Sequence, residues 1–560
     1  MTQSKSATPP IASQHQRFFS WWKQLPPYSL VVILYVLVLL FTDAFFMGDT
    51  VWYALQIQRM MLWESGHLLW RPLGYALWQL LNPLTRQSVG DDALNNIVFT
   101  LTLINWITGV VAVGSLYGLL RRLSDNIWQI CGVTIGFLCA QGFLNYTQSG
   151  SSYSTGLAFL VLGLYGLARG AESYHVKWAL AGGLALAIAV GMWLPLIFAV
   201  PGALFFPLLL FRRERDHVKL VLLSGITFVV VIIALYAITL GMAGITSLPA
   251  LKEWFQEASH NKTTGGLPRA VFGFARSFIS MGDQGVIFKR YVLKDIYNPI
   301  SWSDLLNEGL LKFALFYLFL LAVVIPLVRA RSQWKTLGFV LISSIPVLAF
   351  AIYWQGGDME RYLALYPALF IGVICALRVL PTRSVFSYII WGFLVVATVT
   401  NLSALSKIAL QQQQTAILER LDTVLPALRP QSTVVTINQQ DDVWQFNHSN
   451  PFHPLFRQNG EFVYALPTTN WYQRFSAVAL KTWRNGGDVW ISTRVLHDRP
   501  QADWYWVEGE KENVRRSWKG MYTFFQQFEY GPQPSNPDGF VLLLQSDHNQ
   551  QVLQSAMQEP

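Results

Sequence analysis

The segment MGDTVWYALQIQRMMLWESGHLLWRPLGYALWQLL, residues 47–81, decides how the rest of the chain is interpreted. It follows the first long apolar run, carries a single acid at Asp49, and continues with apolar and aromatic residues at helical spacing. We expect an amphipathic helix that begins at Asp49 and lies along a membrane surface. Pro72 and Gly74 predict a break, after which a second surface helix continues to Leu81.

The composition is typical of a polytopic membrane protein. Hydrophobic residues make up 52% of the 560 residues and charged residues only 13%, whereas soluble proteins have about 25% charged residues. Apolar runs of about twenty residues, enough to cross about 30 Å of hydrocarbon, recur along the chain. We predict an α-helical membrane protein with about eleven transmembrane helices, at residues 28–46, 96–120, 127–146, 150–168, 177–192, 194–211, 218–240, 311–328, 336–353, 362–379 and 384–402.

Basic residues predict the orientation of these helices. They lie in the connections after the second, fourth, sixth, eighth and tenth runs: Arg121 and Arg122, Arg169 and Lys177, 211–219, 329–335 and 378–383. Because cytoplasmic loops are rich in Lys and Arg, the N-terminal segment 1–27 is predicted to be cytoplasmic in a bacterial-type plasma or inner membrane. The external loops of the transmembrane domain 28–402 are then 47–95, 241–310 and 353–361. The net charge of +9 is interpreted by this location, and no nucleic-acid partner is expected.

The tail 403–560 differs in composition from the transmembrane region. Helices are expected at 411–428, 474–487 and 517–528, and strands at 432–437, 462–466, 488–493 and 539–545. Alternating helices and strands predict a soluble α/β domain. The same orientation places this domain outside the cytoplasm.

The first external loop resembles that of the GT-C superfamily of integral-membrane glycosyltransferases, such as the protein O-mannosyltransferases and the aminoarabinose transferases. In that superfamily an acidic motif follows the first span, with Tyr-Ala a few positions later and then a stretch of the type (K/R)PPLGYW. Asp49 matches the acid, Tyr53-Ala54 the Tyr-Ala pair and RPLGY (71–75) the later stretch. Thr50 stands where many members carry a second acid. The Asp-x-Asp metal motif of the oligosaccharyltransferase branch is also absent, so the resemblance implies a mechanism without a cofactor or divalent metal.

A second stretch, GGDMERYLALYPALF (356–370), resembles the late external Arg-Tyr-Leu motif of the same superfamily. There, the resemblance implies, Arg361 helps to bind the phosphate of a polyprenyl-phosphate donor. A guanidinium at a membrane surface is well suited to phosphate. The predicted topology, which is independent of the motifs, places both stretches on the same side of the membrane.

The resemblance implies an inverting glycosyltransferase that moves a sugar from a polyprenyl phosphate to an acceptor on the extracytoplasmic side. Asp49 would be the general base, and Asp43, closer to the apolar run, is the alternative. The candidate phosphate-binding residues are Arg361, Tyr362, Arg71 and Lys289. The candidate substrate-binding residues are Tyr53, Glu64, His67 and Glu360. Loop 241–310 adds His260, Arg269, Arg276 and Arg290 as a candidate substrate gate.

Plainer roles stay open for the same residues. Asp49 could simply cap a helix, Arg361 could anchor its span, and His67 and Arg71 could contact lipid headgroups. The alternative function is a non-enzymatic membrane protein, either a transporter or an assembly scaffold for surface polysaccharide. A transporter should place ionisable residues within its spans, whereas the apolar runs here contain almost none.

Overall fold

The computed structural model describes residues 27–560 apart from 46, 48, 90–92, 211–214, 259–265, 282–286, 289–290, 292–299, 423, 430, 438–442, 445–462, 467–469, 498–510 and 559–560.

The chain forms a mostly helical membrane domain, as predicted. Its long apolar helices satisfy their backbone polar groups internally, which a bilayer requires. They are α5 (Ala93–Leu120), α8 (Ser152–Ser173), α11 (Arg215–Met242), α16 (Leu311–Arg329), α17 (Trp334–Tyr353), η5 with α18 (Met359–Leu365 and Tyr366–Val379) and α19 (Val385–Ala404).

Within the described residues, seven helices are long and apolar enough to cross a membrane. Helices α6 (Ile127–Leu138) and α7 (Gln141–Thr147), bent by 62° to each other, make an eighth if the two form one span. The other three predicted spans coincide with shorter apolar helices: α2 (Pro27–Phe41), α9 (Val176–Met192), and η1 with α10 (Leu194–Ala199 and Val200–Leu210). The fold class is confirmed, and the count of eleven stays a prediction.

A single buried amide stabilises the bend between α6 and α7. The Asn401 side chain donates to the carbonyls of Cys139 and Phe278, both at 2.8 Å, and accepts the Ser280 N–H at 2.7 Å. Asn401 is fully buried. It therefore supplies partners to one backbone group at the bend and to two at the end of α13, and so joins these two places.

The first external loop differs in detail from the prediction. Helix α3 (Thr50–Gln58) is present, but the break lies at Met60, whose φ is 60°. Helix α4 (Trp70–Val89) begins before Pro72 and extends beyond the predicted end at Leu81. The predicted break at Pro72 and Gly74 is therefore wrong. Pro72 lies in the first turn, where a missing N–H removes no helical bond.

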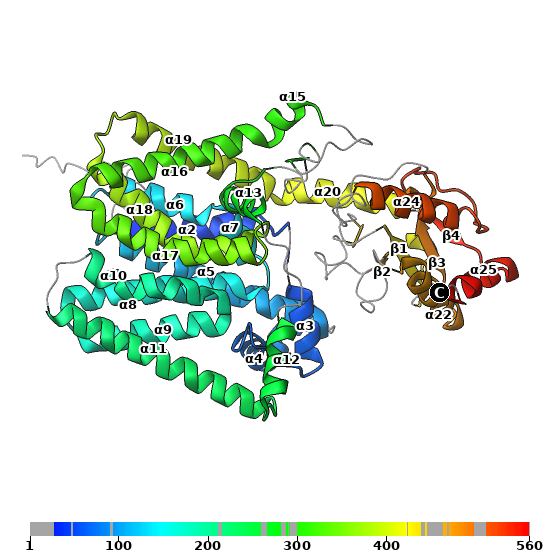
Figure 1. Cartoon of the computed structure of the whole chain (residues 1–560), viewed down its shortest axis with the longest axis horizontal. Helices are drawn as coiled ribbons and strands as arrows, with labels where there is room; N and C mark the ends of the chain where they lie inside the picture. The colour runs from blue at the N-terminus through cyan, green and yellow to red at the C-terminus, as the bar shows by residue number, and fades with distance from the viewer. Residues whose placement is uncertain are drawn as a thin grey trace, which may run out of the picture.

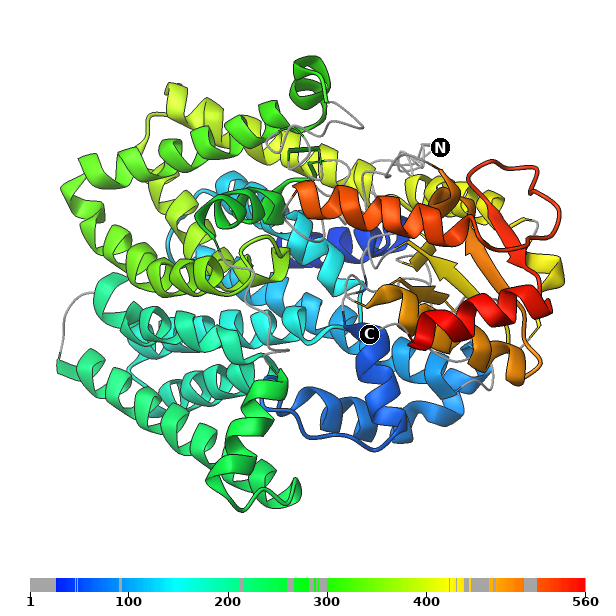
Figure 2. The same cartoon turned by 45° about the vertical axis from the view of Figure 1, so that its right-hand side comes forward.

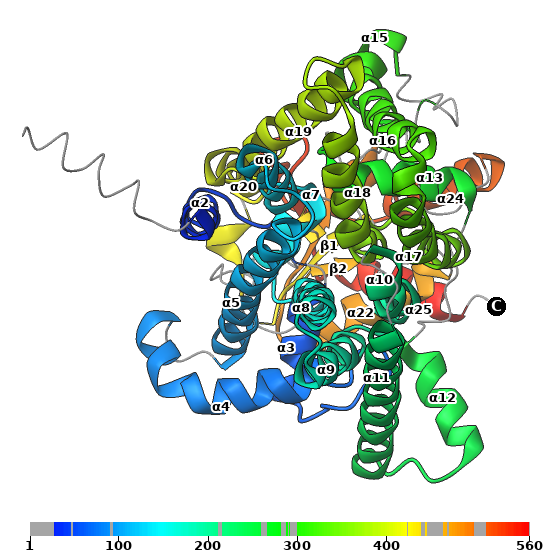
Figure 3. The same cartoon turned by 90° about the vertical axis from the view of Figure 1, so that its left-hand side faces the viewer.

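The loop 241–310 contributes α12 (Leu248–Ala258), α13 (Leu267–Phe278) and α15 (Trp302–Leu305). Figure 1 shows α3, α4, α12 and α13 toward the end of the bundle that faces the C-terminal part of the chain. Figure 3 views the opposite end, where the chain connects α16 to α17 and α18 to α19. The predicted external pieces therefore gather at one end. Which side of the membrane this end faces stays a prediction.

Beyond α19, helix α20 (Lys407–Arg420) leads to a sheet with the strand order β2-β1-β3-β4. Strands β1 (Thr433–Thr436), β2 (Val463–Ala465) and β3 (Val489–Ser492) are parallel, and β4 (Phe540–Leu543) is antiparallel to β3. Helices α22 (Trp471–Arg484), α24 (Lys511–Phe525) and α25 (Asp547–Gln558) accompany the sheet (Figure 2). All four predicted strands are present, and α25 was not predicted.

The sheet alternates its side chains between two apolar clusters, as a strand period of two requires. Val435 and Ile491 pack with Phe475 of α22 and Leu553 of α25. Their neighbours Val434 and Trp490 pack with Leu421 and Phe540 on the other face. Both faces are therefore covered. The domain boundaries at 402 and 403 stay a prediction.

We expect Asn401→Ala to destabilise the protein by roughly 2–4 kcal/mol, because it leaves three buried backbone groups without partners. The measurement is the apparent Tm of the purified protein in detergent. Val399→Ala is the control, since Val399 lies on the same helix with 63% of its surface exposed. Equal Tm values for the two variants would contradict the role assigned to Asn401.

Candidate active site

A cavity of about 660 Å³ lies among α3, the α7–α8 corner, α13 and the segment 354–361. One part of its wall is polar and another is apolar and aromatic. Its ionisable and phenolic residues are Asp49, Tyr53, Glu64, His67, Tyr146, Tyr153, Arg276, Asp358, Glu360 and Arg361.

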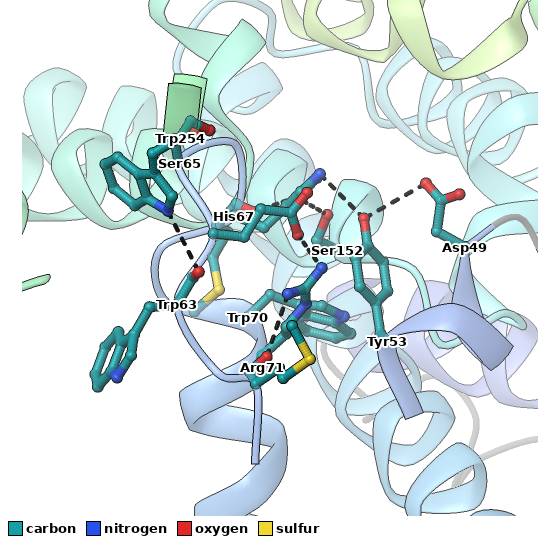
Figure 4. A network of polar contacts seen from close by, with 12 residues as sticks. Asp49, Tyr53, Trp63, Ser65, His67, Trp70, Arg71, Ser152 and Trp254 are labelled. Carbon is teal, nitrogen blue, oxygen red and sulfur yellow. Dashed lines mark hydrogen bonds and ion pairs between the residues drawn. The ribbon is translucent and has the colours of Figure 1, made fainter. Parts of the chain in front are cut away.

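Asp49 immediately precedes α3 but does not cap it with its side chain. Instead, its Oδ2 accepts a hydrogen bond from the Tyr153 hydroxyl at 2.6 Å, and the Tyr53 hydroxyl lies 3.5 Å away. Burial, together with the Asp49 charge, raises the pKa of Tyr53 well above its ordinary value. The carboxylate therefore faces two phenols in the cavity wall, of which Figure 4 shows Tyr53.

His67 lies on the far side of Tyr53 from Asp49 (Figure 4). Its Nε2 is 3.0 Å from the Tyr53 hydroxyl, and its Nδ1 is 3.1 Å from the Met192 carbonyl and 2.7 Å from the Ser152 hydroxyl. A carbonyl can only accept, so Nδ1 carries the proton and Nε2 accepts from Tyr53. Burial lowers the pKa of His67, which keeps the ring neutral. Because a phenol has one proton, Tyr153 is then the donor to Asp49.

Arg71 supports the first loop instead of lining the cavity. It forms an ion pair with Glu64 at 2.5 Å and donates to the Met61 carbonyl at 3.2 Å. Its guanidinium lies 5.7 Å from the centre of the Tyr53 ring. Of the pair, only Glu64 lines the cavity. We therefore do not retain Arg71 as a phosphate ligand.

Arg361 and Glu360 line the cavity together, at the start of the η5–α18 span. The Arg361 guanidinium donates to the Gln355 side chain and lies 3.6 Å from Glu360 Oε1. Glu360 Oε2 accepts from the Tyr146 hydroxyl at 2.6 Å. Tyr362 does not line the cavity within the described structure. Its buried hydroxyl lies 2.6 and 2.8 Å from backbone carbonyls of the 356 turn and of α13, so it joins these two segments.

Two further charged residues in the cavity are Asp358 and Arg276. Arg276 comes from α13 and donates to the Gly357 carbonyl at 3.3 Å. Burial, followed by the charge of Glu360, raises the pKa of Asp358 to about 7, against the opposing effect of Arg361 and Arg276. Asp358 therefore changes charge near neutral pH. The motif at 356–370 contains Asp358, but nothing in the neighbouring sequence predicts that this carboxyl is buried.

Tyr146 and Tyr153 belong to α7 and α8, on either side of the corner at 148–151, and were missed as site residues. Their rings meet edge to face, with centroids 5.0 Å apart. The Tyr146 hydroxyl donates to Glu360, and the Tyr153 hydroxyl donates to Asp49. The available signal was the polar stretch NYTQSGSSYS (145–154), which is unusual between two apolar runs.

The Thr50 side chain joins the first loop to this corner by hydrogen bonds. Its buried hydroxyl accepts the Gly150 N–H at 2.9 Å and donates to the Met47 carbonyl. A carboxylate could not donate the second of these hydrogen bonds. This explains why a second acid is absent beside Asp49.

The remaining candidates lie elsewhere. Asp43 does not line the cavity; its N–H donates to the Leu405 carbonyl at 2.9 Å, and its carboxylate accepts the Ala44 N–H at 2.8 Å. Arg269 is exposed on α13. Lys289, His260 and Arg290 lie outside the described residues. Within the described part of the chain, no group of three or more His, Cys, Asp or Glu is arranged to hold a metal ion.

No protein-family model and no curated protein matches the sequence. Among solved structures, the apo form of ArnT from Cupriavidus metallidurans aligns with a TM-score of 0.51 at 12% identity, covering 94% of this chain and 98% of that chain. ArnT bound to undecaprenyl phosphate aligns at 0.49 and 10% identity, covering 95% and 98%. The Archaeoglobus fulgidus oligosaccharyltransferase in complex with Zn and sulfate aligns at 0.46 and 13% identity, covering 88% and 71%.

The alignment with apo ArnT extends over nearly the whole of both chains, so it concerns the complete architecture and not one shared bundle. It agrees with the resemblance inferred from the two loop motifs. The chain is an integral membrane protein that shares its fold with ArnT.

Proposed function

We propose that the protein is a membrane glycosyltransferase that moves a sugar from a polyprenyl-phosphate donor to an acceptor hydroxyl on the extracytoplasmic side. The observation that carries this proposal is that Asp49 and Arg361, which come from distant parts of the sequence, line one cavity. A carboxylate base and a guanidinium at one cavity are what a transfer from a phosphate leaving group requires. The GT-C fold supports the same class of reaction.

The apolar part of the cavity favours a lipid-linked donor over a soluble nucleotide sugar. Trp193, Phe198, Phe350 and Trp354 line it, and the Phe198 and Phe350 rings stack 4.8 Å apart. Trp354 is adjacent in sequence to Gln355, the hydrogen-bond partner of Arg361. An apolar wall beside a phosphate-binding guanidinium suits a prenyl chain joined to a phosphate. ArnT, which has the same fold, has been solved with undecaprenyl phosphate.

In the proposed reaction, Asp49 accepts the proton of the acceptor hydroxyl. Both phenol contacts are to Oδ2, which leaves Oδ1 for that proton. The acceptor oxygen forms a bond to the anomeric carbon as the bond from that carbon to the phosphate oxygen breaks. The electron pair leaves with the lipid phosphate, and the anomeric configuration inverts. Arg361 and Arg276 stabilise the charge that develops on the phosphate.

The direct test is a transfer assay on the purified full chain with a panel of undecaprenyl-phosphate sugars and an acceptor extract. We expect radiolabelled sugar to leave the lipid with at least one donor. Solute counterflow in proteoliposomes, with no sugar transfer from any donor, would instead support a transporter.

We expect Asp49→Asn to lower kcat about 10²–10⁴-fold, the usual contribution of a general base. The apparent Tm should stay close to that of the wild type, because the amide can still accept from Tyr153. Asp43→Asn is the matched control and should retain transfer, since Asp43 does not line the cavity. Loss of transfer in Asp43→Asn, with transfer retained in Asp49→Asn, would assign the base role to Asp43.

We expect Tyr153→Phe to lower kcat about 10–100-fold, because a hydrogen bond to a charged group contributes about 1.5–3 kcal/mol. The variant removes the 2.6 Å bond that orients Asp49. Tyr75→Phe is the control, since Tyr75 contacts Trp78 and does not line the cavity. If Tyr153→Phe and Tyr75→Phe turned over donor at the same rate, Tyr153 would have no positioning role.

Donor affinity should fall as the pH rises through about 7. Asp358 has a raised pKa of about 7, so it is neutral below this pH and negatively charged above it. The charged form repels the donor phosphate and competes for Arg361 and Arg276. KM for the lipid donor, measured from pH 6 to 8, should therefore rise, and Asp358→Asn should remove the rise. A KM rise that persists in Asp358→Asn would assign the titration to another group.

A further inference from the structure

We propose that a second cavity, at the opposite end of α5 and α8 from Asp49, binds the phosphate of a membrane lipid. It has a volume of about 470 Å³ and lies where α2 begins and where α5 and α8 end. On α8, Tyr153 lines the active-site cavity and Glu172 lines this one, which places them about 29 Å apart at 1.5 Å per residue. Figure 3 views the molecule from this end and shows α2 on the outer side of α5. The proposed transfer reaction does not use this cavity.

The charges at this cavity leave one positive charge uncompensated. Arg122 is held in place: its Nε lies 3.0 Å from Glu172, and its guanidinium lies 4.6 Å from the centre of the Tyr165 ring. Glu172 therefore balances Arg122. Arg121 also lines the cavity, is exposed, and forms no ion pair within the described part of the chain. The cavity thus suits one anionic group.

Tyr117 adds an unused hydrogen-bond donor. Its side chain lines the cavity, but only 2% of its surface is exposed. Arg121 lies close enough to donate to this buried hydroxyl, but no described residue accepts the hydroxyl proton with normal hydrogen-bond geometry. An unsatisfied buried hydroxyl is costly. A phosphate oxygen between Arg121 and Tyr117 would satisfy it.

The surface next to the cavity fits acyl chains and not only a free anion. Ile107 and Val111 are 59% and 38% exposed, and with Gly114 and Gly118 they lie on one face of α5. This face runs from the cavity toward the middle of the membrane. A Cβ on Gly114 would meet no atom within 4 Å, so the groove is open there. Phosphate at the helix ends and chains along an apolar helix face are the arrangement of a membrane phospholipid.

The test is native mass spectrometry of the purified full chain in dodecyl maltoside, titrated with dioleoylphosphatidylglycerol. We expect one bound phospholipid, no comparable binding of dioleoylglycerol, which lacks the phosphate, and about tenfold weaker binding by Arg121→Gln. Gly114→Leu, whose Cβ meets no atom within 4 Å, should abolish binding by filling the groove. Neither residue belongs to the active site, so transfer activity should be unchanged in both variants.

Two control variants separate this site from a general effect of basic residues or of added bulk. Arg331→Gln removes an exposed cation from another predicted cytoplasmic connection, and Gly392→Leu adds bulk at an open position on α19. Both should bind phospholipid like the wild type. Equal losses in test and control variants, or wild-type binding by Gly114→Leu at an unchanged apparent Tm, would overturn the proposal. Displacement of the phospholipid by equimolar glycerol phosphate would show a site for soluble phosphate esters and overturn the lipid assignment.

Discussion

Two hydrogen bonds from one corner of the membrane domain organise the candidate site: Tyr153 to Asp49 and Tyr146 to Glu360, each at 2.6 Å. Both bonds join a phenol to a carboxylate, and hydrogen bonds to a charged group are stronger than neutral ones. Glu360 is buried, whereas Asp49 is exposed. They connect the first loop and the 354–361 segment, which are distant in sequence, through tyrosines only seven positions apart. The bend between α6 and α7 makes this possible, because an unbroken span would carry Tyr146 away from the cavity. Asn401 therefore contributes to the site although it never touches it.

The same cavity balances acids against arginines. Asp49, Asp358 and Glu360 face Arg276 and Arg361, so an anionic donor must compete with resident carboxylates for the guanidinium groups. The raised pKa of Asp358 reduces this competition at neutral pH and below. In the proposed reaction Asp49 accepts the proton, while Asp358 beside the phosphate is partly protonated at neutral pH.

Long-range patterns in the sequence predicted more of the molecule than local motifs did. Apolar runs located the membrane helices, and short apolar segments in the tail located all four strands. The distribution of basic residues implied that Asp49 and Arg361 lie at the same end, where they indeed share a cavity. The first turn of α4 was misjudged because proline in a first turn and proline at a break look alike in sequence. Tyr146 and Tyr153 were missed because their role depends on a bend, and Asp358 because burial is a property of the packed structure. Arg71 matched a family pattern, yet its partner Glu64 turns it away from the cavity.

The central claim is that Asp49 and Arg361 act on one lipid-linked substrate. The most direct measurement is a cryo-EM structure of the full chain with a bound polyprenyl-phosphate sugar. Our account predicts the phosphate within hydrogen-bond distance of Arg361 and the anomeric carbon on the side of the cavity that faces Asp49. A phosphate bound away from Arg361 would contradict it. So would an anomeric carbon out of reach of an acceptor hydroxyl that is hydrogen-bonded to Asp49.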